Sequence, residues 1–164
     1  MADAYTVSDI IAARLTAAWT ATPPDRLRFD DNGPLLDMSS LAPFCQAETA
    51  WGDDTPYIGE PGNRLNRLDG VLMLHFMTPR QDGPAAIRSM HANARAALSN
   101  AVWRVNATTL QLEFGDPAWW LGRDYVGIYM QAIRANRGRP AAEDGSYFGV
   151  TAAIPFYAIY SDTP

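Results

Sequence analysis

The side chains able to do covalent or metal chemistry are few in this chain. Its 164 residues include one cysteine, Cys45, and two histidines, His75 and His91. A single thiol excludes an internal disulfide and any metal site built on several thiolates. Both histidines fall in mainly apolar stretches, and a zinc site needs three or four ligands at a recognised spacing. The sequence therefore predicts neither a nucleophile–histidine pair nor a metal centre.

Two pairs of adjacent carboxylates are the remaining candidates for acid–base chemistry. They are Asp30-Asp31 and Asp53-Asp54. Neighbouring side chains on an extended chain point in opposite directions, so the members of a pair need not converge. We interpret both pairs as solvated turn residues. A hydrolase built on them stays open as an alternative, and it requires a concave pocket where Asp30 or Asp53 meets a histidine or an arginine.

Nucleotide and nucleic-acid binding have weak support. The run Gly59-Glu-Pro-Gly62 lacks the flanking elements and the spacing of a phosphate loop, and no nucleophile elbow is present. The run Arg137-Gly-Arg139-Pro140 matches the core of a minor-groove hook, but Glu143 and Asp144 follow it. The net charge is −5, from 13 basic residues (all arginine) and 18 acidic ones. No cofactor and no bulk nucleic-acid binding are predicted.

The elements that must position these residues follow from periodicity. Apolar residues recur at three- and four-residue steps over about 6–20 and 84–99, which predicts two helices. The nearly all-apolar run 71–77 predicts a central strand. Further strands are expected at 26–30, 44–51, 102–105, 110–114, 125–135 and 150–160. Pro155 interrupts the last of these and predicts an edge position or a bulge.

Two stretches show no period. Residues 52–69 hold four acidic residues, two arginines, two prolines and three glycines, which predicts a long functional loop. A second irregular loop, at about 115–122, carries the adjacent Trp119 and Trp120, a residue type enriched where partners bind. The order of elements predicts one α+β domain over 1–164, with a core of about 5–135 and a C-terminal strand extension of about 136–164. Its sheet is expected to be mixed or antiparallel, with about four to six strands and two main helices packed on one face.

The ends and the hydropathy of the chain suggest an intracellular origin. The chain opens Met1-Ala2-Asp3-Ala4-Tyr5, without the basic start and apolar core of a secretory signal. No stretch approaches the roughly 20 apolar residues of a membrane helix. We therefore expect no contact with a membrane and a reduced thiol in a cytoplasm.

The pattern of elements resembles the phage tail terminator proteins of the lambda type, including those of siphophage-like gene transfer agents. A short helix ends at Trp19, and an aromatic-bearing strand runs to Trp51. The segment Arg67-Leu-Asp-Gly-Val-Leu-Met-Leu-His-Phe-Met-Thr-Pro79 matches the family pattern of polar loop, glycine, apolar strand and proline. An Ala-rich helix and the strand 125–131 complete the pattern of elements shared with the family. The resemblance covers about 5–135, and this chain departs from the family by longer segments at about 115–124 and 136–164.

The resemblance implies a structural virion protein and no enzyme. Such proteins form a hexameric ring that caps the tail tube, stops its polymerisation and offers a surface to the head connector. The implied partners are copies of the chain itself, the major tail tube protein and a head–tail connector or stopper protein. Genomic DNA would pass through the lumen without specific binding. The implied location is the head-proximal end of the virion tail, after assembly in the host cytoplasm.

Eight residues are hypothesised to form interfaces. The expected loop 52–69 contributes polar contacts, in which an arginine can clamp a carboxylate with two hydrogen bonds. Three aromatic residues outside that loop are expected to act as apolar anchors. The set is Asp53, Asp54, Tyr57, Arg64, Arg67, Trp119, Trp120 and Tyr129. Two alternatives stay open beside the hydrolase: another head–tail joining protein (neck or tail completion), and a small binding or toxin-related domain with a ligand of its own.

Overall fold

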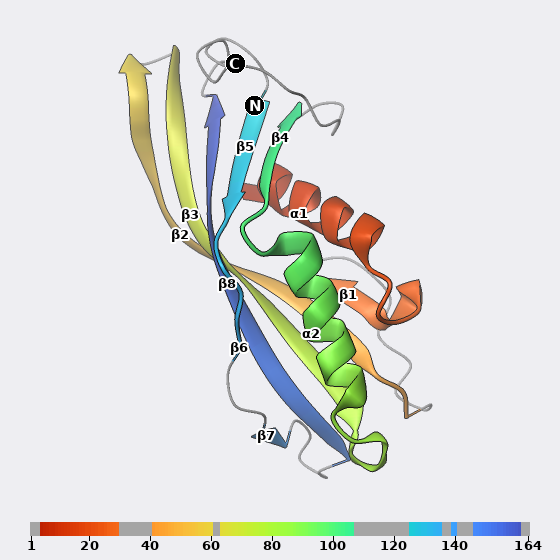
Figure 1. The fold of residues 1–164 in the computed structure, drawn as a ribbon. Helices are drawn as coiled ribbons and strands as arrows, with labels where there is room; N and C mark the ends of the chain where they lie inside the picture. Colours follow the sequence, from red (N-terminus) through yellow and green to blue (C-terminus); the bar gives the residue numbers. More distant parts are fainter. Residues whose placement is uncertain are drawn as a thin grey trace.

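One twisted sheet with both helices on the same face makes up the fold (Figure 1). The structure is a computed structural model that describes residues 4–29, 41–60, 63–106, 125–135, 139–140 and 146–161. The helical elements are α1 (Ala4–Ala18), η1 (Pro24–Arg26), η2 (Arg80–Asp82) and α2 (Ala85–Leu98). The strands are β1 (Leu27–Phe29), β2 (Phe44–Glu60), β3 (Asn63–Pro79), β4 (Val102–Asn106), β5 (Tyr125–Met130), β6 (Arg134–Ala135), β7 (Arg139–Pro140) and β8 (Tyr147–Ser161).

The sheet is mixed, and its strand order is β1-β2-β3-β8-β5-β4. β1 pairs with β2 in parallel, and every other pair is antiparallel. The short β6 and β7 continue along β8 on the side of β5, which brings the sheet to eight strands. The predicted α+β class is confirmed, with a mixed sheet and two helices on one face.

The core lies between the helices and one face of the sheet. Alternate side chains of a strand point to opposite faces, and in β3 the buried set is even-numbered: Leu68, Leu72, Leu74 and Phe76. The helices supply the other side of this core with Val7, Ile10, Ile11 and Leu15 from α1 and Ile87, Met90, Ala94 and Leu98 from α2. These are the apolar stripes that predicted the two helices. The odd-numbered residues of β3 face away from both helices.

The expectation of a long loop at 52–69 is wrong. These residues form the distal half of a β-hairpin, in which β2 and β3 pair from Phe44↔Met77 to Glu60↔Asn63. The register shifts between Trp51 and Asp54 and again between Pro56 and Ile58. Each bulge adds a residue and reverses the in–out phase of the strand, so the alternation that signals a strand is lost from the sequence.

The expectations for the C-terminal strands also need correction. The final strand is expected at an edge or with a bulge, as an extension beyond the core, yet β8 lies between β3 and β5 and pairs with β3 without a register shift. The segment 125–135 was expected as one strand, but it ends as β5 at Met130 and resumes as β6 at Arg134. The carbonyl of Pro155 accepts a hydrogen bond from the backbone N–H of Gln131 at 2.8 Å. Because N–H and C=O of one strand residue point to the same side, the missing N–H of Pro155 faces this interruption, and no hydrogen bond of the β3–β8 ladder is lost.

Pro155→Ala is therefore expected to change the free energy of unfolding by less than about 1 kcal/mol, chiefly through the entropy of the unfolded chain. Ala152→Pro is the matched control, because Ala152 pairs with Leu74 and its N–H points to β3. That substitution removes a central ladder bond and leaves a buried carbonyl unpaired, at a cost of about 1–3 kcal/mol. Urea denaturation followed by circular dichroism distinguishes the two. Equal losses would contradict the placement of Pro155 at the gap.

Some expectations fall outside the described residues. They are the strand at 110–114, the loop with Trp119 and Trp120, and the carboxylate pair Asp30-Asp31.

Candidate interaction surface

The sheet face turned away from the helices carries a cross-strand cluster of arginine, tyrosine and aspartate. The register aligns Asp69 of β3, Tyr157 of β8, Tyr129 of β5 and Val102 of β4 in one row across the sheet. Arg67 stands two residues before Asp69, so both side chains leave the same face of β3. Below this cluster, Leu65 and Ile159 are buried and pack against the two tyrosines. Three adjacent strands thus contribute to one surface, which we call the Arg–Tyr surface (Arg67, Asp69, Tyr129 and Tyr157).

The contacts within the Arg–Tyr surface fix its side chains. The Arg67 guanidinium donates through Nε to Asp69 Oδ1 at 3.1 Å and through its terminal nitrogen at 2.8 Å. The guanidinium carbon lies 4.4 Å from the centre of the Tyr157 ring, and that ring stacks on Tyr129 at 4.7 Å with planes 10° apart. The cation over an aromatic face and the stacked rings both favour a single arrangement. The result is a preorganised surface of residue types that often dominate binding.

The surroundings shift the pKa of two members of this surface, Arg67 and Tyr129. Hydrogen bonding to Asp69 raises the pKa of Arg67, so its side chain remains a cation. Burial raises the pKa of Tyr129, against an opposing effect of the neighbouring Arg104. Tyr57 makes a smaller electrostatic contribution to the pKa of both residues, which places it within reach of the same surface. At neutral pH the surface therefore offers the Arg67 cation, paired with the Asp69 carboxylate, beside the neutral phenol of Tyr129.

The structure brings together some of the residues hypothesised from the sequence. Arg67 and Tyr129 belong to the Arg–Tyr surface, and the half-exposed Tyr57 makes a small electrostatic contribution to the pKa of both. Asp54 is engaged on the opposite, helix-bearing side, where it accepts a hydrogen bond from the hydroxyl of Tyr160. Asp53 is exposed in the first bulge of β2.

The remaining hypothesised residues stay untested. Arg64 pairs with Gly59 near the tip of the hairpin, but its side chain lies outside the described part of the chain. Trp119 and Trp120 are also outside it.

Two members of the Arg–Tyr surface were missed from the sequence, Asp69 and Tyr157. Asp69 follows Arg67 by two residues, which is the spacing that places two side chains on the same face of a strand. That signal was hidden because the segment was read as a loop. Tyr157 stands beside Tyr129 only because β8 pairs with β5 in this register. The register between two strands cannot be deduced from a single sequence.

The two histidines and the cysteine are held by contacts within the sheet and between the sheet and α2. His75 contacts Glu48, at 3.2 Å from Nε2 to Oε1, and Thr151, at 2.9 Å from Nδ1 to Oγ1. His91 packs edge-on against Phe76 with ring centres 6.2 Å apart. Cys45 is buried, and burial raises the pKa of its thiol. Within the described ranges no three histidine, cysteine or acidic side chains gather as a metal site would require.

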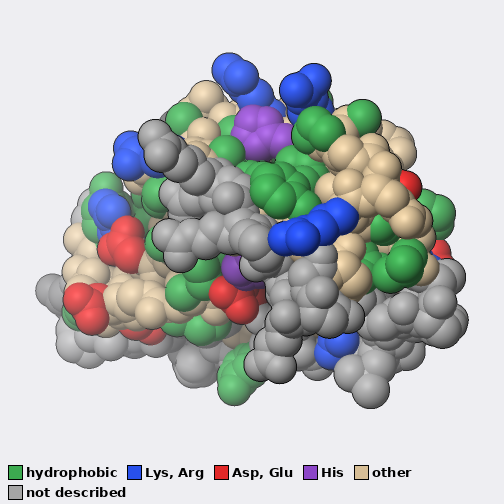
Figure 2. Space-filling model, turned by 90° about the horizontal axis from the view of Figure 1, so that it is seen from below, with side chains coloured by type: hydrophobic (Ala, Val, Ile, Leu, Met, Phe, Trp, Pro, Cys, Tyr) green, Lys and Arg blue, Asp and Glu red, His purple; other side chains and the backbone are tan. Residues whose placement is uncertain are grey.

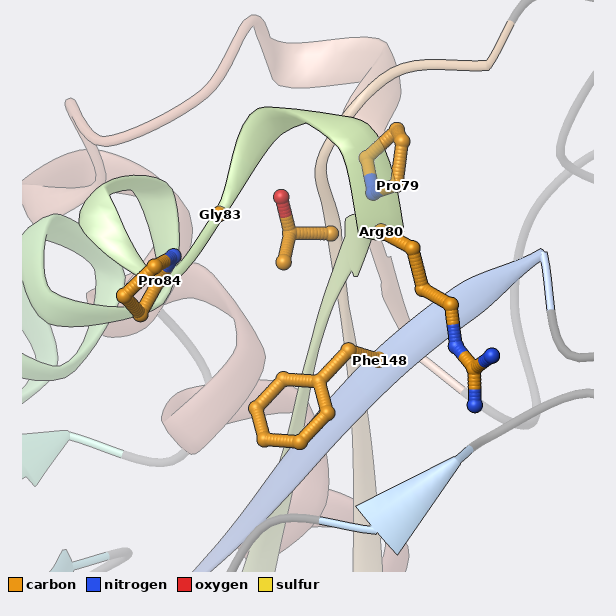
Figure 3. A pocket seen from close by; sticks show the side chains of 6 residues that line it. Pro79, Arg80, Gly83, Pro84 and Phe148 are labelled. Carbon is orange, nitrogen blue, oxygen red and sulfur yellow. The ribbon is translucent and has the colours of Figure 1, made fainter.

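A hollow of 460 Å³ lies where β3 turns into α2. Its walls are mostly apolar, and its lining residues are Thr78, Pro79, Arg80, Gly83, Pro84 and Phe148. Figure 3 shows Phe148 beneath the turn that carries Gly83, with the Arg80 side chain extending away from Pro84. Figure 2 views this end of the molecule, where arginine side chains are spaced around apolar ones. Among the described residues that line it there is no carboxylate and no histidine.

Comparison with known proteins gives structural matches only. No family model and no curated protein matches the chain. One solved structure, whose description names no activity, aligns over 96% of this chain and 96% of its own, with 13% identity and a TM-score of 0.56. This match shows a shared fold. A chain from the virion of a native gene transfer agent particle aligns over 96% of this chain and 86% of its own, with 13% identity. Its TM-score of 0.36 carries no argument about function. Among the described helices, none has the length and apolar character needed to cross a bilayer.

Proposed function

We propose that this chain is a structural protein of a phage-like virion and, more narrowly, a tail terminator whose ring caps the tail tube. The observation that carries the proposal is the Arg–Tyr surface. Its side chains are ordered by one another, it lies on the sheet face without a helix, and two of its members were hypothesised as interface residues from the resemblance. None of its members lines the hollow at the turn from β3 to α2, and an ordered surface on an open sheet face suits a protein partner.

A ring of identical copies requires few surfaces on each copy. Each copy needs two different patches that meet on neighbouring copies, and two ends that meet other proteins. In this proposal the other proteins are the major tail tube protein on one side and a head–tail connector or stopper protein on the other. The net charge of −5 suits a lumen through which DNA passes without being retained. No catalytic step and no cofactor are required, and the work is done by surfaces.

Electron microscopy of the purified protein and of assembled tails tests the proposal. We expect six-fold rings and a labelled subunit at the head-proximal end of the tube. Arg67→Ala is expected to abolish tube capping, so that tube lengths become heterogeneous. Arg88→Ala, on the exposed side of α2, is the matched control and should leave the lengths unchanged. A chain that is monomeric both alone and in tails, or normal capping by Arg67→Ala, would overturn the proposal. A label on the connector instead of the tube end would favour a neck or tail completion protein.

A further inference from the structure

The two edges of the sheet carry opposite charge. β2 contains four acidic residues and no arginine, and β1 covers it only at positions 45–47. On the opposite side, β4, β6 and β7 each contain one arginine and no acidic residue. We call the first the acidic edge (Glu48, Asp53 and Asp54) and the second the arginine edge (Arg104 and Arg134). Figure 1 shows β2 and β4 standing apart at opposite sides of the sheet.

The register places one acidic residue of β2 level with an arginine at the other edge. Glu48 pairs with Met73, Met73 with Ala153, and Ala153 with Arg134, so one row links an acid at one edge to an arginine at the other. A second row begins at Thr55, beside Asp54, and ends at Arg104 through the pairs of Arg67, Ile159 and Gly127. Glu48 therefore stands at the same height along the strands as Arg134, whereas the row of Arg104 meets β2 at Thr55, one residue beyond Asp54.

Exposed apolar side chains accompany these charges at both edges. Val102 is 53% exposed on β4, while Tyr57 and Trp51 are 51% and 39% exposed on β2. Large apolar side chains at two separate edges are typical of surfaces that meet partners. The two bulges and Pro56 interrupt β2 as a template for another strand, which favours contact through side chains over extension of the sheet.

From these observations we propose that the acidic edge of one copy of this chain docks against the arginine edge of the next copy. Rotation about an axis preserves height along that axis, so a ring whose axis follows the strands needs complementary groups at equal heights. The row from Glu48 to Arg134 meets this requirement. The contact is heterologous, since one patch meets a different one, so it does not stop at a dimer, and in the proposed ring its rotation closes. This inference rests on the proposed ring and names the surfaces that form it.

Engineered disulfides test the contact directly. Asp53 lies in the bulge opposite Asp69, in the row that ends at Val102. Within one copy these positions are four strand spacings apart, roughly 19 Å, which is too far for a disulfide. Oxidation of the Asp53→Cys/Val102→Cys variant is expected to give a ladder of covalent multimers, because each copy can link to two neighbours. Cys45 is buried and leaves the background clean.

The controls separate this inference from the proposed function. Asp53→Cys/Arg88→Cys moves one thiol to the exposed side of α2 and is expected to give no ladder. Arg134→Glu is expected to weaken self-association of the wild-type sequence by tenfold or more in light scattering at low salt. If the wild-type chain forms rings but the two double-cysteine variants cross-link alike, the edges are wrong and the ring stands. If the wild-type chain never associates, alone or in tails, the proposed function fails and this contact fails with it.

Discussion

Gly70→Ala is expected to lower the free energy of unfolding by about 2 kcal/mol, within the range for overpacked cores. An added Cβ would lie 2.5 Å from Cζ and 2.9 Å from Cε1 of Phe156, far closer than real contacts. The ring cannot step aside easily, because Phe156 is buried and Trp51 packs edge-on against it with centres 5.9 Å apart. Urea denaturation followed by tryptophan fluorescence measures the loss.

The ring of Phe156 provides the internal control for this prediction. Gly70→Ala in a Phe156→Leu background should cost less than the sum of the two single changes, since the clash is with the ring. Gly52→Ala is the matched glycine: its Cβ would lie 3.2 Å from the carbonyl oxygen of Asp69, in an exposed part of the hairpin. We expect it to cost clearly less than Gly70→Ala. A Gly70→Ala protein as stable as the wild type would show that the ring does not rest on this glycine.

The parts of the fold that could be predicted are those that follow from patterns of neighbouring residues in the sequence. The stripes of α1 and α2 follow from steps of three and four residues, and the central part of β3 follows from its apolar run. The hairpin was missed because its two bulges break the alternation around Asp53 and Tyr57. The central place of β8 was missed because Pro155 usually marks an edge, and its tolerance depends on the gap between β5 and β6, far away in the sequence.

The candidate surface was predictable only in part for the same reason. Arg67 and Tyr129 were singled out by residue type and by the resemblance. Their neighbourhood depends on two pairings, Asp69↔Tyr157 and Tyr129↔Tyr157, which join strands about 90 and 30 residues apart in the chain. Residue type and spacing can therefore single out candidate members of such a surface. Which of them lie side by side depends on the register of the sheet.

The second large effect is a loss of stability when the core between the helices and the sheet is truncated. Leu74→Ala is expected to cost about 3 kcal/mol, because Leu74 has no exposed surface and the substitution leaves a cavity under the helices. Met73→Ala, one residue earlier in β3, is the matched control. Met73 is half-buried on the face without helices, so its truncation should cost about 1 kcal/mol or less. Thermal and urea unfolding of both variants give the comparison.

The size of this difference decides how assembly experiments are to be interpreted. If Leu74→Ala costs several times more than Met73→Ala, the fold depends on the helix-bearing face, and the opposite face is free to carry residues chosen for partners. Changes at Arg67 or Tyr157 would then alter assembly while the subunit remains folded. Equal losses from Leu74→Ala and Met73→Ala would contradict this division, because both faces would then be needed for folding. In that case a capping defect in Arg67→Ala would report stability as much as contact.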